Sequence, residues 1–434
     1  MSRQLRVRPA TQPLSGTYRP PGDKSISHRV AILGGLASGL TQIDGFLDAE
    51  DTRATLNAMA RLGADVSEHD GTISIRGGEL SAPDQALDLG NSGTGIRLLA
   101  GMLAGRHELF GSEITLLGDA SLSTRPMGRI IDPLGQMGAL IHSDNQRAPM
   151  TIRPQALKCL RYASPVASAQ VKSSVLLAGL AASGDTVVIE PGPSRDHTER
   201  LLPAFGVDVL DGAPGVGVRG GSSLSATSVQ VPGDLSSAAF ILAAGFLVPE
   251  SEIVLENVGL NPTRDGVLRV MDAMGASLAV ELEDAVGLEP VGRLQARFGA
   301  LQGVGIPASW VPLAIDEFPI IMAMAAAAEG QTVVQGAQEL RVKESDRIAV
   351  MCTALKALGV EVTETASGAV ITGGKIQGGR VDCHGDHRIA MSAAVLGLVA
   401  EGEVLIDQAE FIATSYPGFV DDLNRLGADV DWID

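Results

Sequence analysis

Apolar residues along the chain follow two alternating helix patterns, and each pattern occurs six times. The first is amphipathic: a short helix ends at a glycine, and the apolar alternation of a strand follows. In the first copy, Leu56 and Met59 lie on one face and Arg53 and Asn57 on the other, which predicts a half-exposed outer helix. A helix can end in the left-handed conformation that glycine tolerates. The copies span 59–66, 133–141, 202–210, 270–280, 355–362 and 423–430, and their glycines are Gly63, Gly138, Gly206, Gly275, Gly359 and Gly427.

The second pattern is apolar or small on nearly every side, which predicts buried helices. Each copy begins with a residue of the capping type, such as Asp, Asn or Ser. The N-terminus of a helix carries unpaired N–H groups and partial positive charge, so several such ends brought together would form an anion site. The six segments are 23–39, 90–105, 168–184, 233–248, 316–330 and 385–402.

The two patterns interleave and predict an α/β fold built from six repeats of roughly 70 residues each. Pro-Gly pairs precede buried helices in "RPPGD" (19–23) and "VPGD" (231–234), and these two segments are the predicted hinges. Repeats one to three, residues 22–230, are predicted to form one domain. Repeats four to six are predicted to form the other domain, from residues 1–21 and 231–434.

Composition and charge narrow the class of protein. The chain has 434 residues, 45% of them hydrophobic, and a formal net charge of −18, so it is a folded protein with no expected nucleic-acid or membrane partner. Cys159, Cys352 and Cys383 are widely spaced, which predicts neither disulfides nor a metal site. The N-terminus lacks an apolar signal segment, and the apolar run 238–248 is too short to span a bilayer. A cytoplasmic location is expected.

Cations recur at equivalent places in the repeats, although the net charge is acidic. Any one of them could be an ordinary solvated surface charge, but random surface charge would not follow a repeat. The glycine-rich segment 90–95 departs from the dinucleotide fingerprint and is not interpreted as a nucleotide site. The recurring cations are Lys24, Arg29, Arg97, Arg125, Lys343, Arg347 and Arg388.

Seven segments together resemble the motif set of the 5-enolpyruvylshikimate-3-phosphate synthase family, in its class II form. They are "PGDKSISHR", "LGNSGTGIRLL", "STRPMGR", "SAQVKSSVLLAGL", "DEFP", "RVKESDRI" and "GDHRIAM", and they cover nearly the whole chain. The resemblance implies two domains, each made of three βαβαββ units arranged as an inside-out α/β barrel. In that fold the buried helices are parallel, and their N-termini face an interdomain cleft.

The resemblance also implies a reaction and its substrates. The enolpyruvyl group of phosphoenolpyruvate is transferred to the 5-hydroxyl of shikimate 3-phosphate, and phosphate is released through a tetrahedral intermediate, with no cofactor. Both substrates are polyanions, which arginine and lysine side chains suit. The residues implied for phosphoenolpyruvate are Lys24, Gly93, Arg125, Gln170, Arg347 and Arg388; those for shikimate 3-phosphate are Lys24, Ser25, Arg29, Ser168, Ala169, Gln170, Ser194, Asp316 and Lys343.

Three residues are implied to move protons. Asp316 is expected to act as the base at the 5-hydroxyl, and either Glu344 or Lys24 as the acid at the methylene carbon. Each carboxylate also has a simpler interpretation. Asp316 could cap the N-terminus of a helix, and Glu344 could be an ion-pair partner of Arg347.

Three positions depart from the better-known class I pattern and resemble class II usage: His197, Glu339 and Thr414. They replace a tyrosine, an asparagine and a lysine, so one expected cation near phosphoenolpyruvate is absent. The response to the herbicide glyphosate is left open, because Gly93 resembles the sensitive form while the class II background often accompanies tolerance.

Two alternative functions fit the sequence less well. The sister enolpyruvyl transferase that acts on UDP-N-acetylglucosamine usually carries a reactive cysteine ahead of the Arg-Pro pair, and "GDASLSTRPMG" has none. A metabolite-binding protein without catalysis would not need both Asp316 and Glu344 beside its cations. The sequence predicts a monomer, whose two hinges let the domains open without ligand.

Overall fold

The six apolar segments form buried helices in the computed structural model, which describes residues 3–211, 214–286 and 289–433. Five of the helices begin after an Asp or Ser whose side chain accepts a backbone N–H of the first turn. The sixth begins after Glu317 with no such bond, so the interpretation of Asp316 as a helix cap was wrong. These helices are α1 (Lys24–Leu36), α3 (Gly93–Ala104), α5 (Ala169–Gly179), α7 (Leu235–Leu247), α9 (Phe318–Ala327) and α11 (His387–Gly397).

The outer helices are also present, and all six of their terminal glycines adopt positive φ, between 75° and 113°, as predicted. The third outer helix is only five residues long and continues as a 3-10 turn over Leu202–Phe205, because Pro203 lacks the N–H that an α-helix needs. The six are α2 (Glu50–Arg61), α4 (Gly128–Gln136), α6 (His197–Leu201), α8 (Gly266–Ala273), α10 (Arg347–Ala357) and α12 (Phe419–Arg425).

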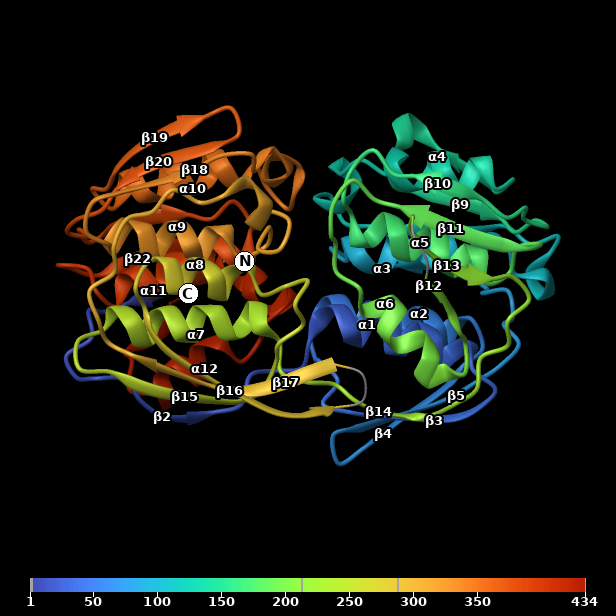
Figure 1. Cartoon of the computed structure of the whole chain (residues 1–434), viewed down its shortest axis with the longest axis horizontal. Helices are drawn as coiled ribbons and strands as arrows, with labels where there is room; N and C mark the ends of the chain where they lie inside the picture. Colours follow the sequence, from blue (N-terminus) through green and yellow to red (C-terminus); the bar gives the residue numbers. More distant parts are fainter. Residues whose placement is uncertain (1–2, 212–213, 287–288, 434) are drawn as a thin grey trace. The chain divides into compact units, whose positions relative to one another are not determined.

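Contacts divide the chain into two units. In Figure 1, most of unit 2 runs from blue to green, and unit 1 combines the blue N-terminal strands with segments coloured from yellow-green to red. Unit 1 comprises Met1–Pro21, Pro232–Asp284 and Pro290–Asp434, and unit 2 comprises Gly22–Val231 and Ala285–Glu289. The last stretch departs from the predicted division, which placed it with residues 231–434. Each unit has its own apolar core, and among the described residues no helix is long and apolar enough to cross a membrane.

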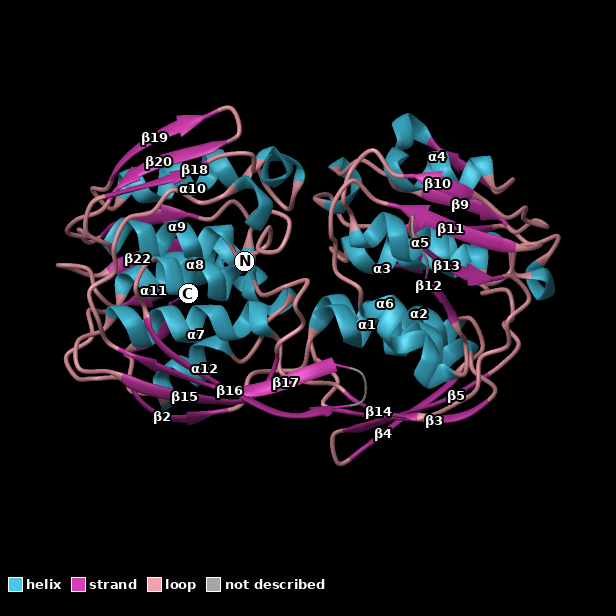
Figure 2. Ribbon diagram, viewed as in Figure 1, coloured by secondary structure: helices cyan, strands magenta, loops and turns pink. Residues whose placement is uncertain are grey.

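In its described residues, unit 2 contains three four-stranded sheets that share one pairing scheme. In each sheet the first two strands are parallel and the remaining pairs are antiparallel. In Figure 2, the first of these sheets lies below α1, α2 and α6. The sheet orders are β14 (Ser228–Gln230), β3 (Gly39–Asp44), β5 (Thr72–Gly77), β4 (Asp65–His69); β6 (Leu87–Asp88), β7 (Ile114–Leu117), β9 (Met150–Arg153), β8 (Leu140–Ser143); and β10 (Arg161–Ala163), β11 (Asp185–Ile189), β13 (Val216–Arg219), β12 (Val209–Asp211).

Unit 1 uses the N-terminal strands to complete two of its sheets. β1 lies between two C-terminal strands, with Leu5 opposite Ile406 and Trp432, and β2 runs parallel to β15. The third sheet has three strands, and Gly305 forms only an isolated bridge to Val333 at its edge. The orders are β16 (Ser277–Val286), β17 (Glu289–Arg297), β15 (Glu252–Gly259), β2 (Ser15–Tyr18); β18 (Gln331–Val334), β20 (Gly368–Thr372), β19 (Glu361–Thr365); and β21 (Gly379–Asp382), β22 (Val404–Asp407), β1 (Gln4–Val7), β23 (Val430–Ile433).

Candidate functional site

Lys24 is the first residue of α1 in unit 2, and a buried aspartate holds its ammonium group. Asp23 caps the helix by accepting the Ile26 N–H at 2.9 Å, which begins the helix at Lys24. The Nζ atom of Lys24 lies 2.5 Å from Oδ2 of Asp51 in α2. This contact fixes the position of the ammonium group at the N-terminal end of the helix, where the partial charge of the helix is also positive.

Arg29 lies one turn further along α1 and is almost fully buried, with 3% of the residue exposed. Its guanidinium donates hydrogen bonds to three neutral oxygens: Oγ1 of Thr198 at 2.7 Å, the carbonyl of Ser25 at 2.8 Å and Oγ of Ser173 at 2.7 Å. Burial lowers the pKa of Arg29 to about 10, although acidic side chains including Glu199 oppose this shift. Arg29 is therefore a rigidly held cation suited to an anionic ligand.

His28 lies beside these two cations in the core of unit 2, and its Nδ1 is 2.8 Å from Oγ1 of Thr55. Burial, with the positive charges of Lys24 and Arg29, holds the pKa of His28 well below its usual value. The folded protein therefore keeps this ring neutral at pH values where the unfolded chain would protonate it.

We expect this histidine to make the protein less stable in mild acid. Below the unfolded-state pKa of about 6.5, the unfolded state binds a proton that the folded state does not, so the free energy of unfolding falls as pH falls, by up to about 1.4 kcal/mol per pH unit. Urea unfolding followed by circular dichroism from pH 8 to pH 5 measures this slope. His28→Gln should show a slope shallower by one proton, and equal slopes would contradict the assignment.

The N-terminal ends of α3 and α5 meet through Gln170, which two α3 residues hold. Its Oε1 accepts from Nη1 of Arg97 at 2.7 Å, and its Nε2 donates to Oγ1 of Thr94 at 2.9 Å. A Cβ at Gly93, the first residue of α3, would lie 3.0 Å from Nη1 of Arg125. The guanidinium of Arg125 also donates to Oδ1 of Asn91. The glycine thus lets this arginine approach the helix end closely.

Glu190 accepts hydrogen bonds from both Ser168 and Ser194. Ala169 follows Ser168 as the first residue of α5. Ser168 caps α5, and its own N–H donates to Oε1 of Glu190 at 2.9 Å. The hydroxyl of Ser194 donates to the second carboxylate oxygen of Glu190, also at 2.9 Å. Unit 2 therefore carries the candidate residues Lys24, Ser25, Arg29, Gly93, Arg125, Ser168, Ala169, Gln170 and Ser194.

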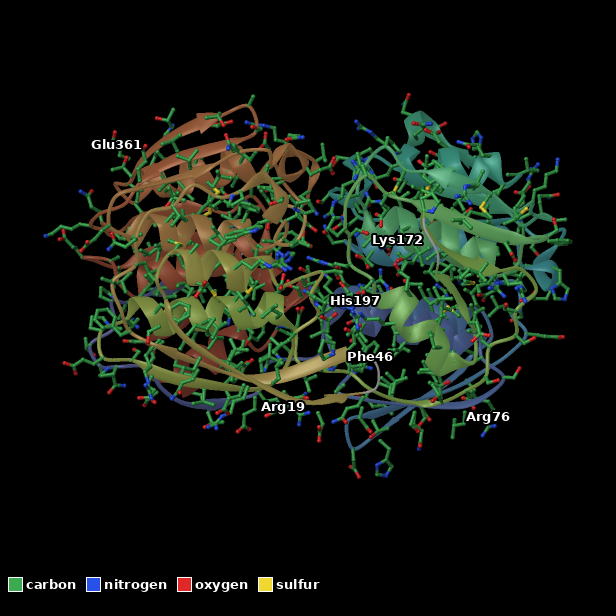
Figure 3. The ribbon with its side chains drawn as sticks, in the orientation of Figure 1. Arg19, Phe46, Arg76, Lys172, His197 and Glu361 are labelled. Atoms are coloured by element: carbon green, nitrogen blue, oxygen red, sulfur yellow. The ribbon has the colours of Figure 1, made fainter. Side chains whose placement is uncertain are left out.

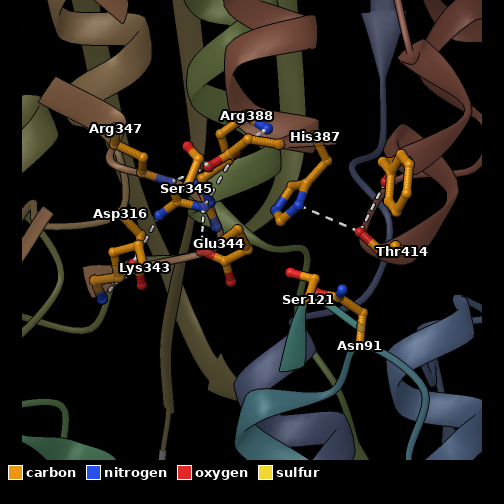
Figure 4. Close-up of polar contacts among 12 residues, drawn as sticks. Asn91, Ser121, Asp316, Lys343, Glu344, Ser345, Arg347, His387, Arg388 and Thr414 are labelled. Atoms are coloured by element: carbon orange, nitrogen blue, oxygen red, sulfur yellow. Dashed lines mark hydrogen bonds and ion pairs between the residues drawn. The ribbon is translucent and has the colours of Figure 1, made fainter. Parts of the chain in front are cut away.

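Unit 1 carries the remaining candidates, and they gather around Arg347, the first residue of α10 (Figure 4). Its guanidinium contacts three carboxylates: Asp386 at 2.8 Å, Glu344 at 2.6 Å and Asp316 at 3.5 Å. The predicted ion pair between Glu344 and Arg347 is therefore present. Nζ of Lys343 lies 2.9 Å from Oδ1 of Asp316, so that carboxylate faces two cations.

The Arg347 side chain is held charged although only 1% of it is exposed. Burial by itself lowers its pKa, but the negative charges of Asp386, Glu344 and Asp316 outweigh that effect, and the net shift is upward. Asp386 caps α11 by accepting the N–H of Arg388 at 3.0 Å, which connects the carboxylates to the start of that helix.

Two further contacts involve the start of α11. Nη1 of Arg388 lies 3.9 Å from Oε1 of Glu317, just before α9. Thr414, where the sequence lacks the expected lysine, places its hydroxyl 3.2 Å from Nδ1 of His387, and both residues are buried. A histidine ring thus stands beside the threonine at this position (Figure 4).

The other two departures from the class I pattern have different surroundings. His197 is buried in α6, with Nδ1 2.7 Å from Oε1 of Glu289. Glu339 is half-buried in the 3-10 turn Gln338–Val342. Within the described ranges, no group of three or more His, Cys, Asp or Glu side chains is placed to hold a metal ion.

Several residues of this site are not among the predicted ones. Asp51, Asn91, Glu190 and Asp386 each contact a candidate residue or the start of its helix. Asn91 and Asp386 could have been found, because each is the second residue of a predicted buried-helix segment, 90–105 or 385–402. Asp51 lies in an outer helix and Glu190 follows a strand, and the sequence pattern at these two positions carries no signal that they face a cation or a serine.

Comparison with known proteins finds relatives along nearly the whole chain. Residues 9–423 match the family model of EPSP synthase (3-phosphoshikimate 1-carboxyvinyltransferase). The chain is 52% identical over 423 residues to the 3-phosphoshikimate 1-carboxyvinyltransferase of Acidithiobacillus ferrooxidans, covering 96% of each chain, and 50% identical to that of Nitrosococcus oceani, covering 94% and 92%. A solved structure of EPSP synthase from Acinetobacter baumannii matches with a TM-score of 0.88 and 45% identity, over 100% of both chains.

Proposed function

The chain belongs to the EPSP synthase (3-phosphoshikimate 1-carboxyvinyltransferase) family. We propose which of its residues bind each substrate and which transfer protons in the reaction of this family. The protein is a transferase of the shikimate pathway, which leads to chorismate and the aromatic amino acids. It moves the enolpyruvyl group of phosphoenolpyruvate to the 5-hydroxyl of shikimate 3-phosphate and releases phosphate.

We infer that phosphoenolpyruvate is bound by the cations around the ends of α1, α3, α10 and α11. Arginine forks match carboxylate and phosphate groups, and Gly93 leaves room for a close approach beside Arg125. Arg29, with three neutral hydrogen-bond partners, supplies positive charge for the phosphate of shikimate 3-phosphate. The other proposed contacts to that substrate are Lys24, Ser25, Ser168, Ala169, Gln170, Ser194, Asp316 and Lys343, while Lys24, Arg125, Gln170, Arg347 and Arg388 hold phosphoenolpyruvate.

The single observation that carries the catalytic assignment is the position of the Asp316 carboxylate, 2.9 Å from Lys343 and 3.5 Å from Arg347. We propose that Asp316 accepts the 5-hydroxyl proton while that oxygen forms a bond to C2 of phosphoenolpyruvate. Glu344 or Lys24 protonates the methylene carbon in the same addition. In the elimination that follows, the methyl group returns a proton to the residue that donated one, the double bond re-forms, and the C2–O bond to the leaving phosphate breaks.

We also infer the finer architecture from the repeated features of the two units. The shared strand order of the unit 2 sheets and the six left-handed glycines support six βαβαββ repeats, three per unit, in an inside-out α/β barrel. Helix N-termini facing an interdomain cleft would gather the positive ends of the buried helices. A monomer in the cytoplasm is the proposed state.

The two units should close around the substrates, because the candidate residues for each substrate are divided between them. The proposed hinges are 19–23 and 231–234, which include the unit boundaries at Pro21–Gly22 and Val231–Pro232. Small-angle scattering with and without a shikimate 3-phosphate analogue should show a smaller radius of gyration with the analogue. An unchanged profile would count against hinge closure.

Phosphate release from phosphoenolpyruvate tests the function directly, with shikimate 3-phosphate and UDP-N-acetylglucosamine supplied in parallel. We expect release only with shikimate 3-phosphate. Lys24→Met should lower kcat/KM by about 10- to 100-fold, because a hydrogen bond to a charged group is lost. Lys375→Met, which removes an exposed lysine paired with Glu401, is the matched control and should leave the rate unchanged. Release with only the nucleotide sugar, or with neither acceptor, would overturn the proposal.

A further inference from the structure

Lys172 is a buried lysine in the second turn of α5, inside unit 2 (labelled in Figure 3). Only 4% of its side chain is exposed. Its Nζ lies 2.9 Å from Oε2 of Glu190 and 2.8 Å from Oε1 of Glu199, and it donates to the carbonyl of Ser194 at 3.3 Å. A buried ammonium group is costly, so three oxygen partners at these distances are needed to keep it in the folded protein.

The charge state of this lysine follows from its surroundings. Burial by itself lowers the pKa of Lys172, but the charges of Glu199 and Glu190 and their hydrogen bonds outweigh it, and the net shift is upward. Lys172 therefore carries a positive charge in the folded protein, and it offsets the negative charge of Glu190.

Glu190 connects this ammonium group to two candidate substrate residues. Its Oε1 accepts the backbone N–H of Ser168, and its Oε2 accepts the hydroxyl of Ser194, both at 2.9 Å. Lys172 also holds the Ser194 carbonyl directly. The two serines come from separate places in the chain, the start of α5 and the loop after β11, and Glu190 is the residue that both contact.

We propose that Lys172 and Glu190 are a positioning pair that presents Ser168 and Ser194 to shikimate 3-phosphate, an inference that rests on the proposed function. Glu190 sets where the two serines lie, and Lys172 holds Glu190 in place. Lys172 has a second effect: it neutralises a carboxylate that would otherwise repel an anionic substrate bound at these serines. Neither residue touches the reacting atoms.

Glu199 provides a matched control for this proposal. It pairs with the same ammonium group at a similar distance, and it lies in α6. Glu190→Gln and Glu199→Gln each remove one negative charge beside Lys172, with almost no change in side-chain shape. Only the first also replaces one of the two oxygens that accept from Ser168 and Ser194 by an amide nitrogen, which cannot accept a hydrogen bond.

The experiment measures steady-state kinetics with each substrate varied, together with calorimetric binding of shikimate 3-phosphate and thermal midpoints. Glu190→Gln should raise KM and Kd for shikimate 3-phosphate about 10-fold, with kcat and KM for phosphoenolpyruvate within about twofold of the wild type. Glu199→Gln removes a charge that also acts on Arg29, so it should raise KM and Kd for shikimate 3-phosphate less than Glu190→Gln does and leave kcat and KM for phosphoenolpyruvate within about twofold. If Lys172→Met folds, it should show the same rise in KM and Kd for shikimate 3-phosphate as Glu190→Gln. If it does not fold, the comparison of Glu190→Gln with Glu199→Gln tests the proposal.

Three results would overturn the proposal. The first is an equal rise in KM for shikimate 3-phosphate in both glutamine variants, and the second is no rise in Glu190→Gln. The third is a fall in kcat and a rise in KM for both substrates, all by similar factors. Turnover by the wild type decides the proposed function separately. Wild-type turnover with no difference between the two variants would reject the positioning pair and leave the function intact. A wild type that neither turns over nor binds shikimate 3-phosphate would reject both.

Discussion

Replacing Asp316 by asparagine should lower kcat by about two to four orders of magnitude, the range typical of a lost general base. An amide cannot accept the 5-hydroxyl proton at neutral pH, yet its oxygen can still accept hydrogen bonds from Lys343 and Arg347, which lie 2.9 and 3.5 Å from Oδ1. The surrounding cluster should therefore survive, and KM values should change much less than kcat. Steady-state phosphate release with both substrates varied separates the two parameters.

Asp429→Asn is a suitable control, because Asp429 is an exposed aspartate that also pairs with an arginine, Arg8 at 2.6 Å. It should leave kcat and the thermal midpoint unchanged. If Asp316→Asn retains more than about a tenth of the wild-type kcat, the base is another group, and Asp316 serves only to hold Lys343 and Arg347.

The second large effect is expected at Arg347, where Arg347→Met should lower the free energy of unfolding by about 3–5 kcal/mol. The substitution leaves Asp316, Glu344 and Asp386 close together without the buried cation that now contacts all three. Phosphoenolpyruvate binding should be lost as well. Thermal and urea unfolding, followed by tryptophan fluorescence from Trp310 and Trp432 in the same unit, measures the loss of stability.

The pH dependence of that loss separates charge repulsion from simple loss of packing. Without Arg347, protonation of one of the crowded carboxylates relieves their mutual repulsion in the folded variant, so the variant gains stability relative to the wild type as pH falls. The deficit relative to the wild type should therefore shrink between pH 8 and pH 5. A deficit independent of pH would contradict the electrostatic account. Arg380→Met, which removes an arginine paired with Asp407 at the surface, should have little effect.

Much of the candidate site could be predicted because it lies at the starts of helices that the hydrophobic pattern reveals. Lys24, Gly93 and Ala169 are each the first residue of a buried helix, and Asp, Ser or Asn residues mark those starts in the sequence. The prediction was wrong for Asp316 as a cap, since α9 begins two residues later at Phe318. A local capping signal does not tell which of two neighbouring acids immediately precedes the helix.

Sequence patterns alone predict the order of the buried and outer helices, the positions of their terminal glycines and the residue types available for binding polyanions. These features depend on periodicity and on backbone conformations that only a few residue types adopt, so they are local. The tertiary structure decided the partners: Asp51 for Lys24, Asp386 for Arg347, and Glu190 with Lys172 for Ser168 and Ser194. Such pairs join residues from different elements. The interaction energy of each pair depends on the distance between the groups and on their burial, and the folded chain sets both.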